Sequence, residues 1–456
     1  MEDVTVKDIV EATKGVLLCG DENTPVSELC TNSREIKQGA LFVPLLGEKV
    51  DAHRFIESAL ETGAATLTSE HDSVILAEKP YIRVNNTLTA MQAIAKWQRG
   101  RIHLEKMVGV TGSVGKTTTR EMIACALSAG RKTYQTERNY NSQVGVPICI
   151  SHISSSDQMA VLEMGMSEEG QIAVLSDMVR PDICVVTTIG VAHIAQLKSQ
   201  ENIRKEKLSV ISGMPDDGTL FLNGDDPMLH EMRGKMPCRT LFYGTQEWCD
   251  YRAENIQFHD GTSSFDCVHG KERVHVELNT LGRHNVCNCI CALGVADVAG
   301  VSMSLAAPAF AHFTGQRQRV IEREGQYTII DDTYNASPTS MKASIDVLAD
   351  MPCEGKRYAV LGDMFELGDH TNQYHYEVGS YAANADIDEV ICIGELAKQI
   401  KQGVDDADTR VKAYSFLDKE EAAIYLISLL KPEDIVMIKA SNGMNLGDIV
   451  NILLSA

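Results

Sequence analysis

The chain has 456 residues, which is too long for one ordinary hydrophobic core, so two or three domains are expected. Hydrophobic residues make up 44% and charged residues 23%, a composition that excludes disordered and membrane-spanning classes. The 42 Lys and Arg against 63 Asp and Glu give a net charge of −21, which argues against a nucleic-acid partner, because that binding depends on clustered cations.

No apolar run reaches the roughly 20 residues that cross a bilayer. The N-terminal MEDVTVKDIV is acidic where a secretion signal is basic, so we expect a cytoplasmic protein without membrane insertion. Among 13 cysteines the one cluster is CNCIC at 287–291, interpreted as small hydrophobes on or near a helix. A zinc site of Cys287, Cys289 and Cys291 is disfavoured, since tetrahedral sites usually draw paired ligands from turns.

Short apolar runs at 39–45 and 79–86, with a helix-like stretch at 53–64 between them, predict a small α/β domain over 1–84. From residue 106 the pattern becomes one of apolar strands separated by helix-like stretches, which implies crossovers and a parallel sheet. In this central part, assigned to 85–313, apolar strands are expected at 158–166, 170–179, 182–190 and 218–226.

Between 250 and 280 the pattern predicts a hairpin with DGTSS as its turn. The remainder, 314–456, repeats the alternation and predicts a Rossmann-like, doubly wound domain. Its strands are expected at 326–332, 356–364, 388–394 and 433–441, each followed by a helical pattern. The expected fold class is therefore α/β with three domains, the central one built on a P-loop and a mostly parallel sheet.

The stretch GVTGSVGKTTTR at 109–120 lies between an apolar strand and a helix with one apolar face. Backbone N–H groups and a helix N-terminus converge on an anion in that setting. Lys116 would reach the β- and γ-phosphates and Thr117 would place its hydroxyl on Mg²⁺. The spacing departs from the usual Walker A pattern, with Val110 five residues before Gly115, and a plain glycine turn is the alternative. The predicted phosphate-binding residues are Gly112, Ser113, Val114, Gly115, Lys116, Thr117 and Thr118.

A nucleotide site alone does not identify a reaction, because switches, motors, kinases and ligases share it. The Asn-Lys-x-Asp guanine reader of GTP switches is absent from the sequence. A ligase needs metal ions that spread charge over the transferred phosphoryl group. Glu163 ends one predicted strand and His193 follows another, so both fall at the carboxyl edge where ligands gather. By pattern alone Glu163 could be a solvated carboxylate, His193 a packed residue and Lys207 a solvent-facing lysine.

Taken together, these residues resemble the Mur ligase family across nearly the whole chain. The family loop Thr-Gly-x-x-Gly-Lys-Thr-Thr is matched at 111–118, a Glu-Met-Gly at 163–165, and a histidine after an Ile-Gly turn at 189–193. The best match is to the branch that adds D-alanyl-D-alanine. That match rests on DDTYNASPTSM at 331–341, GDMFELG at 362–368, TERNYNSQVGVP at 136–147 and LGRHNVCN at 281–288.

The resemblance implies that ATP phosphorylates the C-terminal carboxylate of a UDP-N-acetylmuramoyl tripeptide. The amine of D-alanyl-D-alanine then attacks the acyl phosphate, giving a UDP-linked pentapeptide, ADP and phosphate in peptidoglycan precursor synthesis. Electrostatic preorganisation and proximity would supply most of the acceleration. The alternatives are a Mur-type or folylpolyglutamate-type ligase that adds one amino acid, and a P-loop NTPase that makes no bond. We expect a monomer that acts on small molecules.

The resemblance also implies roles by position. Lys116, Glu163, His193 and Lys207 would be catalytic, and two Mg²⁺ ions would be held by Thr117, Glu163, His193 and a Lys207 carbamylated with CO₂, whose carbamate is a hard oxygen ligand. The C-terminal domain would close onto ATP through a hinge near 313. Further nucleotide contacts would come from His284, Asn285, Asn288, Arg317 and Asp332, and substrate contacts from Ser33, Arg34, Asn139, Asn141, Tyr334 and Asn335.

Three groups of these further residues also have a plain structural interpretation. Helix-start packing would explain His284, Asn285 and Asn288, a strand-to-helix turn would explain Tyr334 and Asn335, and a turn cap would explain Ser33 and Arg34. Five positions depart from the pattern of the family and bear on the nucleotide and acceptor contacts. They are Asn32, Ser142, Thr188, Ser209 and Asn442.

Overall fold

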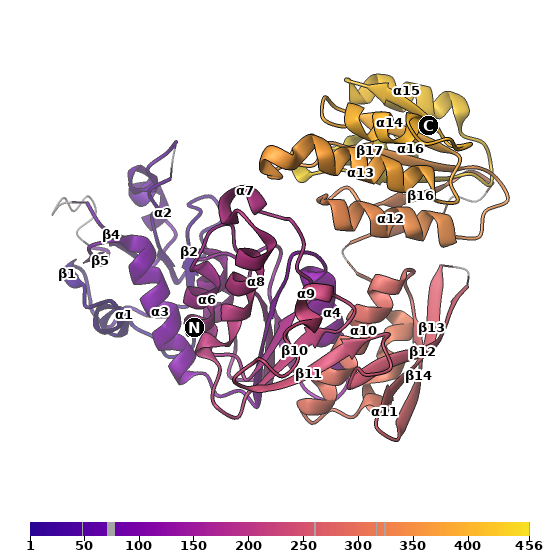
Figure 1. Ribbon diagram of the computed structural model, residues 1–456. Coiled ribbons are helices and arrows are strands. Elements are labelled where there is room, and N and C mark those ends of the chain that lie inside the picture. The colour runs from indigo at the N-terminus through magenta and orange to yellow at the C-terminus, as the bar shows by residue number, and fades with distance from the viewer. Residues whose placement is uncertain (48, 71–77, 260, 316, 323–324, 456) are drawn as a thin grey trace.

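The computed structural model describes residues 1–47, 49–70, 78–259, 261–315, 317–322 and 325–455. Three sheets follow one another along the chain, and each belongs to a separate lobe (Figure 1). The expected three-domain α/β class with mostly parallel sheets is confirmed. Among the described residues, no helix is both long enough and apolar enough to cross a membrane.

The first lobe has a five-stranded sheet in the order β1-β5-β4-β3-β2, with only β1 antiparallel to its neighbour. The helix expected at 53–64 is a 3₁₀ turn followed by a short helix. Helix α3 packs against α5 and α6 of the next lobe, so it connects the two. The bounds are α1 Val6–Thr13, β1 Val16–Cys19, β2 Glu28–Cys30, β3 Ala40–Phe42, η1 Ala52–Phe55, α2 Ile56–Leu60, β4 Ala65–Thr68, β5 Tyr81–Arg83 and α3 Thr87–Arg101.

The central lobe has a nine-stranded sheet in the order β14-β13-β12-β11-β10-β9-β6-β8-β7, parallel from β7 to β12. The strands are β6 Lys106–Thr111, β7 Thr133–Gln135, β8 Met159–Glu163, β9 Ile183–Val186, β10 Thr219–Asn223, β11 Arg239–Gly244, β12 Tyr251–His259, β13 Thr262–His269 and β14 Glu272–Leu278. The expected hairpin is β12 and β13, and β14 adds a further antiparallel strand. Asp260 of the expected turn lies outside the described residues, and the next residues, from Thr262 on, already belong to β13.

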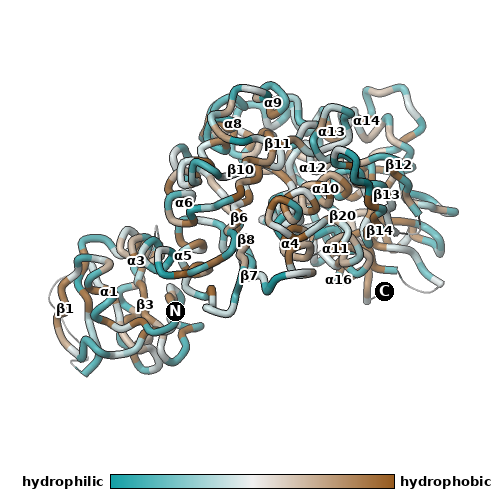
Figure 2. The backbone as a smooth tube through the Cα atoms, turned by 90° about the horizontal axis from the view of Figure 1, so that it is seen from below, coloured by the Kyte–Doolittle hydropathy of each residue, from teal (hydrophilic) through white to brown (hydrophobic). Residues whose placement is uncertain are grey.

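Helices cover both faces of the central sheet, and its hydrophobic core is correspondingly divided in two. In Figure 2 the brown, hydrophobic segments concentrate in the central strands and in α4 and α10. Helices α4 and α10 cover one face, and α5, α6 and α8 the other. The bounds are α4 Lys116–Ser128, α5 Gly145–His152, α6 Gln171–Val179, α7 Ile194–Leu197, α8 Gln200–Leu208, η2 Ser209–Gly213, α9 Pro227–His230, α10 Arg283–Val298, α11 Met303–Ala306 and η3 Ala307–His312.

Two sequence interpretations are resolved in this lobe. The apolar segment at 170–179 is helix α6 and not a strand, because its buried residues Ile172, Leu175, Ser176 and Val179 recur at helical spacing. The interpretation of the CNCIC cluster is confirmed, since its three cysteines lie in α10 and are buried among hydrophobic side chains.

The third lobe has a six-stranded sheet in the order β15-β16-β20-β17-β18-β19, parallel except for β15. Helices α12, α13 and α14 cover one face and α15 and α16 the other, as in a doubly wound fold. The bounds are β15 Arg319–Ile321, β16 Thr328–Asp331, α12 Pro338–Asp350, β17 Arg357–Gly362, η4 Gly368–His370, α13 Thr371–Ala383, β18 Glu389–Ile393, α14 Lys398–Asp405, β19 Lys412–Phe416, α15 Lys419–Leu429, β20 Ile435–Lys439, η5 Asn442–Met444 and α16 Gly447–Ser455.

Candidate active site

The glycine-rich loop joins the end of β6 to the start of α4, as the sequence predicts. Gly112 has φ +151°, and a Cβ placed there would lie 1.8 Å from Oγ1 of Thr187. Gly115 has φ +85° and caps the N-terminus of α4. Only glycine fits these two positions without displacing neighbouring atoms. The loop therefore presents its backbone to the cleft beside a helix N-terminus, which is the arrangement that binds phosphate.

Residues after β9 hold the loop in place. The Oγ1 of Thr187 donates to the carbonyl of Val114 at 2.6 Å. The Oγ1 of Thr188 accepts from the N–H of Val114 at 3.0 Å and lies 3.3 Å from its carbonyl. The carbonyl of Thr188 accepts from the N–H of Ser113 at 2.9 Å. The loop is thus fixed before any ligand arrives.

We expect Gly112→Ala to weaken ATP binding and to lower the free energy of unfolding, because the added methyl group meets the Thr187 side chain. Overpacking of this kind costs about 1–3 kcal/mol. Gly170→Ala is the matched control, since Gly170 also has positive φ but nothing lies within 4 Å of its Cβ position. Thermal unfolding and ATP titration of both variants measure the difference. Wild-type ATP affinity in Gly112→Ala would contradict the assigned role of the loop.

Two lysines converge on one carbonyl oxygen behind the loop. The Nζ of Lys116 and the Nζ of Lys207 each lie 2.9 Å from the oxygen of Gly112. Lys207 is 3% exposed, and burial together with the charge of Lys116 holds its pKa well below the usual range. Burial also lowers the pKa of Lys116, with Glu163 acting in the opposite direction. Burial and the charge of Lys116 both shift the protonation equilibrium of Lys207 toward the neutral amine.

Glu163 ends β8 and is 2% exposed. Its Oε2 accepts from Oγ1 of Thr117 at 3.0 Å, and its Oε1 accepts from Nδ2 of Asn141 at 2.7 Å. None of the ion pairs between described residues includes Glu163. A buried carboxylate beside a hydroxyl, without an ion-pair partner, suits a hard divalent cation.

His193 precedes α7 in a left-handed conformation with φ +61°. Its Nδ1 lies 2.8 Å from Oε2 of Glu366 in the third lobe, although the angle is not that of a hydrogen bond. Burial lowers the pKa of His193, and Glu366 opposes that shift. A neutral imidazole is the form that binds metal ions.

A cleft of about 1250 Å³ lies between the central and third lobes. Its wall brings together most residues predicted for the site. They are Ser113, Val114, Gly115, Lys116, Thr117, Thr118, Asn139, Asn141, Glu163, His193, His284, Asn285, Asn288, Arg317, Asp332, Tyr334 and Asn335. Three of the departing positions, Ser142, Thr188 and Asn442, line it too. The cleft therefore joins segments far apart in the sequence.

Four predicted residues lie outside the cleft wall. Gly112 and Lys207 are placed immediately behind the phosphate loop by their shared hydrogen bond. Ser33 and Arg34 lie in a turn of the first lobe, where the N–H of Arg34 donates to Oδ1 of Asn32 at 3.1 Å. Arg34 is exposed there. The structure thus does not bring this pair to the phosphate loop.

Several cleft residues are also held by neighbours. The Oγ1 of Thr119 donates to Oδ1 of Asn288 at 3.0 Å, which ties α4 to α10. The Nδ2 of Asn285 donates to the carbonyl of Leu281 at 2.7 Å. The guanidinium of Arg317 lies over the ring of Tyr334, and its Nη2 donates to Oγ1 of Thr117 at 3.2 Å. Arg317 therefore brings a cation of the third lobe to the candidate metal position.

Sequence reasoning missed Lys439 and Glu366 as individual residues. Lys439 is 3% exposed, and its Nζ lies 2.7 Å from Oδ2 of Asp332 and 3.0 Å from the carbonyl oxygen of Asn335. The sequence feature that could have identified Lys439 is its position as a lysine at the end of a buried strand. Glu366 lay inside the quoted GDMFELG motif, but nothing local points to its partner.

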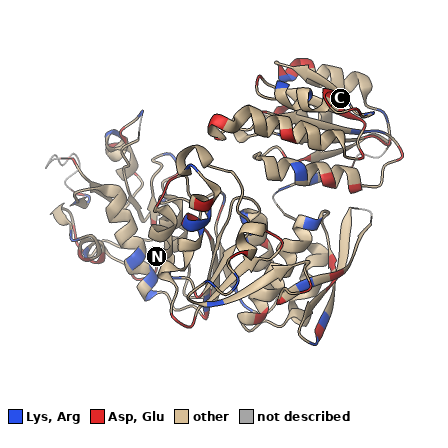
Figure 3. Ribbon diagram, in the orientation of Figure 1, with Lys and Arg blue, Asp and Glu red and all other residues tan. Residues whose placement is uncertain are grey.

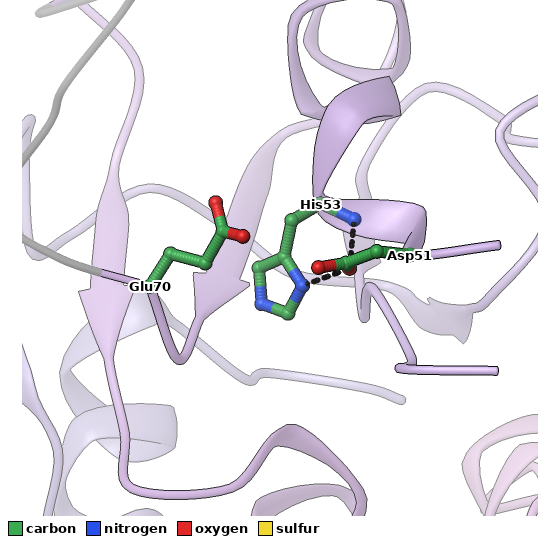
Figure 4. A group of neighbouring side chains, drawn as sticks. All are labelled: Asp51, His53 and Glu70. Carbon is green, nitrogen blue, oxygen red and sulfur yellow. Dashed lines mark hydrogen bonds and ion pairs between the residues drawn. The ribbon is translucent and has the colours of Figure 1, made fainter. Parts of the chain in front are cut away.

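One further cluster of ligand-type side chains lies in the first lobe (Figure 4). Nδ1 of His53 lies 2.7 Å from Oδ1 of Asp51, and Glu70 is near. The N–H of Ser69 donates to Nε2 of His53 at 3.1 Å. Because a backbone N–H can only donate, Nε2 is the acceptor and Nδ1 carries the proton. Both ring nitrogens are thus occupied, and the cluster fixes the loop before η1.

Comparison with known proteins decides the family. The Mur ligase middle domain matches residues 110–296, the glutamate ligase domain of Mur ligases matches 316–442, and the catalytic domain of the Mur ligase family matches 25–99. The chain belongs to the Mur ligase family. This Mur ligase is 35% identical to the UDP-N-acetylmuramoyl-tripeptide–D-alanyl-D-alanine ligase of Bacillus subtilis, over 99% of this chain and 98% of the relative.

It is 29% identical to the ligase of the same name from Escherichia coli, over 99% of each chain. Its structure resembles that of MurF from Acinetobacter baumannii with a TM-score of 0.90, at 27% identity and 99% coverage of both chains. It also resembles MurF from Thermotoga maritima in complex with ADP, with a TM-score of 0.83 at 27% identity, over 94% of this chain and 97% of that one. This Mur ligase is an enzyme of the ligase class.

Proposed function

We propose that this Mur ligase joins D-alanyl-D-alanine to UDP-N-acetylmuramoyl tripeptide at the expense of ATP. The product is the UDP-linked pentapeptide of peptidoglycan synthesis, with ADP and phosphate. The observation that carries the proposal is a full-length match to relatives named for this reaction, together with a cleft that contains their motifs. ATP binding is supported by the ADP complex of the Thermotoga relative.

The donor set fits magnesium. Thr117 and Glu163 would hold one ion, and His193 with a carbamylated Lys207 a second. When bound, such ions spread the charge of the transferred phosphoryl group. Lys116 and the N–H groups of the loop bind the phosphates, and the cleft between lobes orients the carboxylate toward the incoming amine.

Carbamylation of Lys207 requires a neutral amine. The neutral amine nitrogen attacks CO₂, one proton leaves the nitrogen, and the charge at this position changes from zero to negative. Two buried ammonium groups on the carbonyl of Gly112 would repel one another, so the amine form of Lys207 is favoured. Its burial also excludes bulk water from the product.

Binding of the substrates is assigned to three segments of the chain. Residues 1–84 bind the UDP portion through the turn that carries Ser33 and Arg34, and 85–313 bind ATP. Residues 314–456 close onto ATP through a hinge near 313 and bind the dipeptide. The enzyme acts as a cytoplasmic monomer on small molecules. Figure 3 shows Lys and Arg residues interspersed with Asp and Glu residues along the ribbons of the lobes.

The test is phosphate release from ATP and Mg²⁺, with tripeptide precursor and D-alanyl-D-alanine supplied separately and then together. We expect release only with both, a UDP-linked pentapeptide by mass, and loss of activity when EDTA removes the metal. Release that ignores the peptide would support an NTPase instead. Product formation with a single amino acid would support another ligase of the fold.

A further inference from the structure

A loop of the third lobe touches the central lobe beside the candidate metal site. The 3₁₀ turn η4 packs against α7, and a Cβ on Gly368 would lie 3.3 Å from Ala195. Figure 1 shows the start of α13, which follows η4, directed toward α7. Glu366, just before η4, is the residue of this loop whose carboxylate reaches His193.

The loop is held firmly within its own lobe. The N–H of Met364 donates to Nε2 of His375 at 2.9 Å, and His375 is fully buried. The N–H of Phe365 donates to Oγ of Ser441 at 2.9 Å. Glu366 follows with φ +63°. The backbone that carries Glu366 therefore moves with the third lobe.

The contact of Glu366 with His193 pairs a carboxylate with a histidine, as in sites where a carboxylate supports a metal-binding histidine. A histidine that binds metal through one ring nitrogen usually has its other N–H held by a carboxylate, which fixes the orientation of the ring. Here Nδ1 faces Glu366, which leaves Nε2 as the remaining ligand atom. Here the carboxylate comes from the third lobe, which is proposed to move relative to the lobe that carries His193.

We infer that Glu366 is a positioning residue that couples closure of the third lobe to magnesium binding at His193. This inference rests on the proposed function. Closure brings the carboxylate to the imidazole and strengthens metal binding, and metal binding favours closure by the same factor, because coupling between two equilibria is reciprocal. The second metal site is then complete only in the closed enzyme.

The test compares the full-length wild type with Glu366→Gln and Glu366→Asp. The magnesium concentration for half-maximal ligation is measured first. Compaction by small-angle scattering is then titrated with magnesium in the presence of a non-hydrolysable ATP analogue and tripeptide precursor. Glu395→Gln is the matched control, because Glu395 lies in the same lobe with its side chain 71% exposed.

For Glu366→Gln we expect a half-maximal magnesium concentration raised by about 10–100-fold, the range found for supporting residues of metal ligands. Compaction should require correspondingly more magnesium, the KM for ATP at saturating magnesium should stay within about twofold, and Glu366→Asp should recover part of the loss. Wild-type magnesium dependence in both measurements would overturn the inference. Loss of compaction in Glu366→Gln with unchanged magnesium dependence of ligation would also overturn the inference. That result would mean that Glu366 only links the two lobes. A wild type that needs neither magnesium nor both substrates would overturn the proposed function instead.

Discussion

Replacement of Lys207 by alanine is expected to reduce ligation by more than about 100-fold and to leave the fold intact. Loss of residues that merely support a metal ligand already costs 10–100-fold, and loss of an anionic ligand should cost more. The alanine also removes a buried amine from the carbonyl of Gly112, but Lys116 still donates there. The measurement is the rate of pentapeptide formation alongside thermal unfolding.

Short carboxylic acids should partly rescue Lys207→Ala, because a carboxylate can replace the carbamate in the space left by the side chain. Lys205→Ala is the control, since Lys205 lies on the same helix with its side chain 80% exposed. Incubation with ¹³C-labelled bicarbonate should give a carbamate signal in wild type that the variant lacks. Turnover of Lys207→Ala at the wild-type rate would remove Lys207 from the site.

Replacement of Lys116 by alanine is expected to reduce phosphate release and ligation together by about 10²–10³-fold, as loss of one preorganised donor does in other enzymes. Lys116 is the lysine of the phosphate loop, and its Nζ is already fixed by the carbonyls of Gly112 and Ser113. Lys132→Ala is the control, because that side chain lies in the same lobe and is 59% exposed.

The losses of activity caused by Lys116→Ala and Lys207→Ala should not be additive. Burial and, after it, the charge of Lys116 lower the pKa of Lys207. Removal of Lys116 takes away the second of these effects, so it raises the pKa of Lys207 and leaves less neutral amine for CO₂. Part of the activity lost in Lys116→Ala would then come from weaker metal binding, because less Lys207 would be carbamylated. A double variant whose loss equals the product of the two single losses would show that the sites act independently.

Local patterns explain what the sequence could predict. The phosphate loop is specified by its glycines and the flanking strand and helix, so its placement required no distant contact. Glu163 and His193 follow strands of one parallel sheet, and that topology brings them to the same edge. The confirmed fold class rests on the same alternation of strand and helix.

Contacts between segments far apart in the sequence were not predictable in this way. The ion pair of Glu366 with His193 joins two lobes, and that of Lys439 with Asp332 joins the ends of neighbouring strands in the third lobe. No periodicity specifies how these segments meet. The helix at 171–179 was mistaken for a strand because a short apolar run fits both periods, and only the burial of one face distinguishes them.

Position 188 shows how a departure from a family pattern can preserve its chemistry. The family pattern that this sequence resembles has asparagine there, and an asparagine side chain carries both a hydrogen-bond donor and an acceptor. The hydroxyl of Thr188 offers the same pair, and it meets both the N–H and the carbonyl of Val114. Thr188 can therefore fix the phosphate loop although it departs from the family pattern. The hydrogen-bonding capacity of the side chain, rather than its identity, determines whether the loop is held at this position.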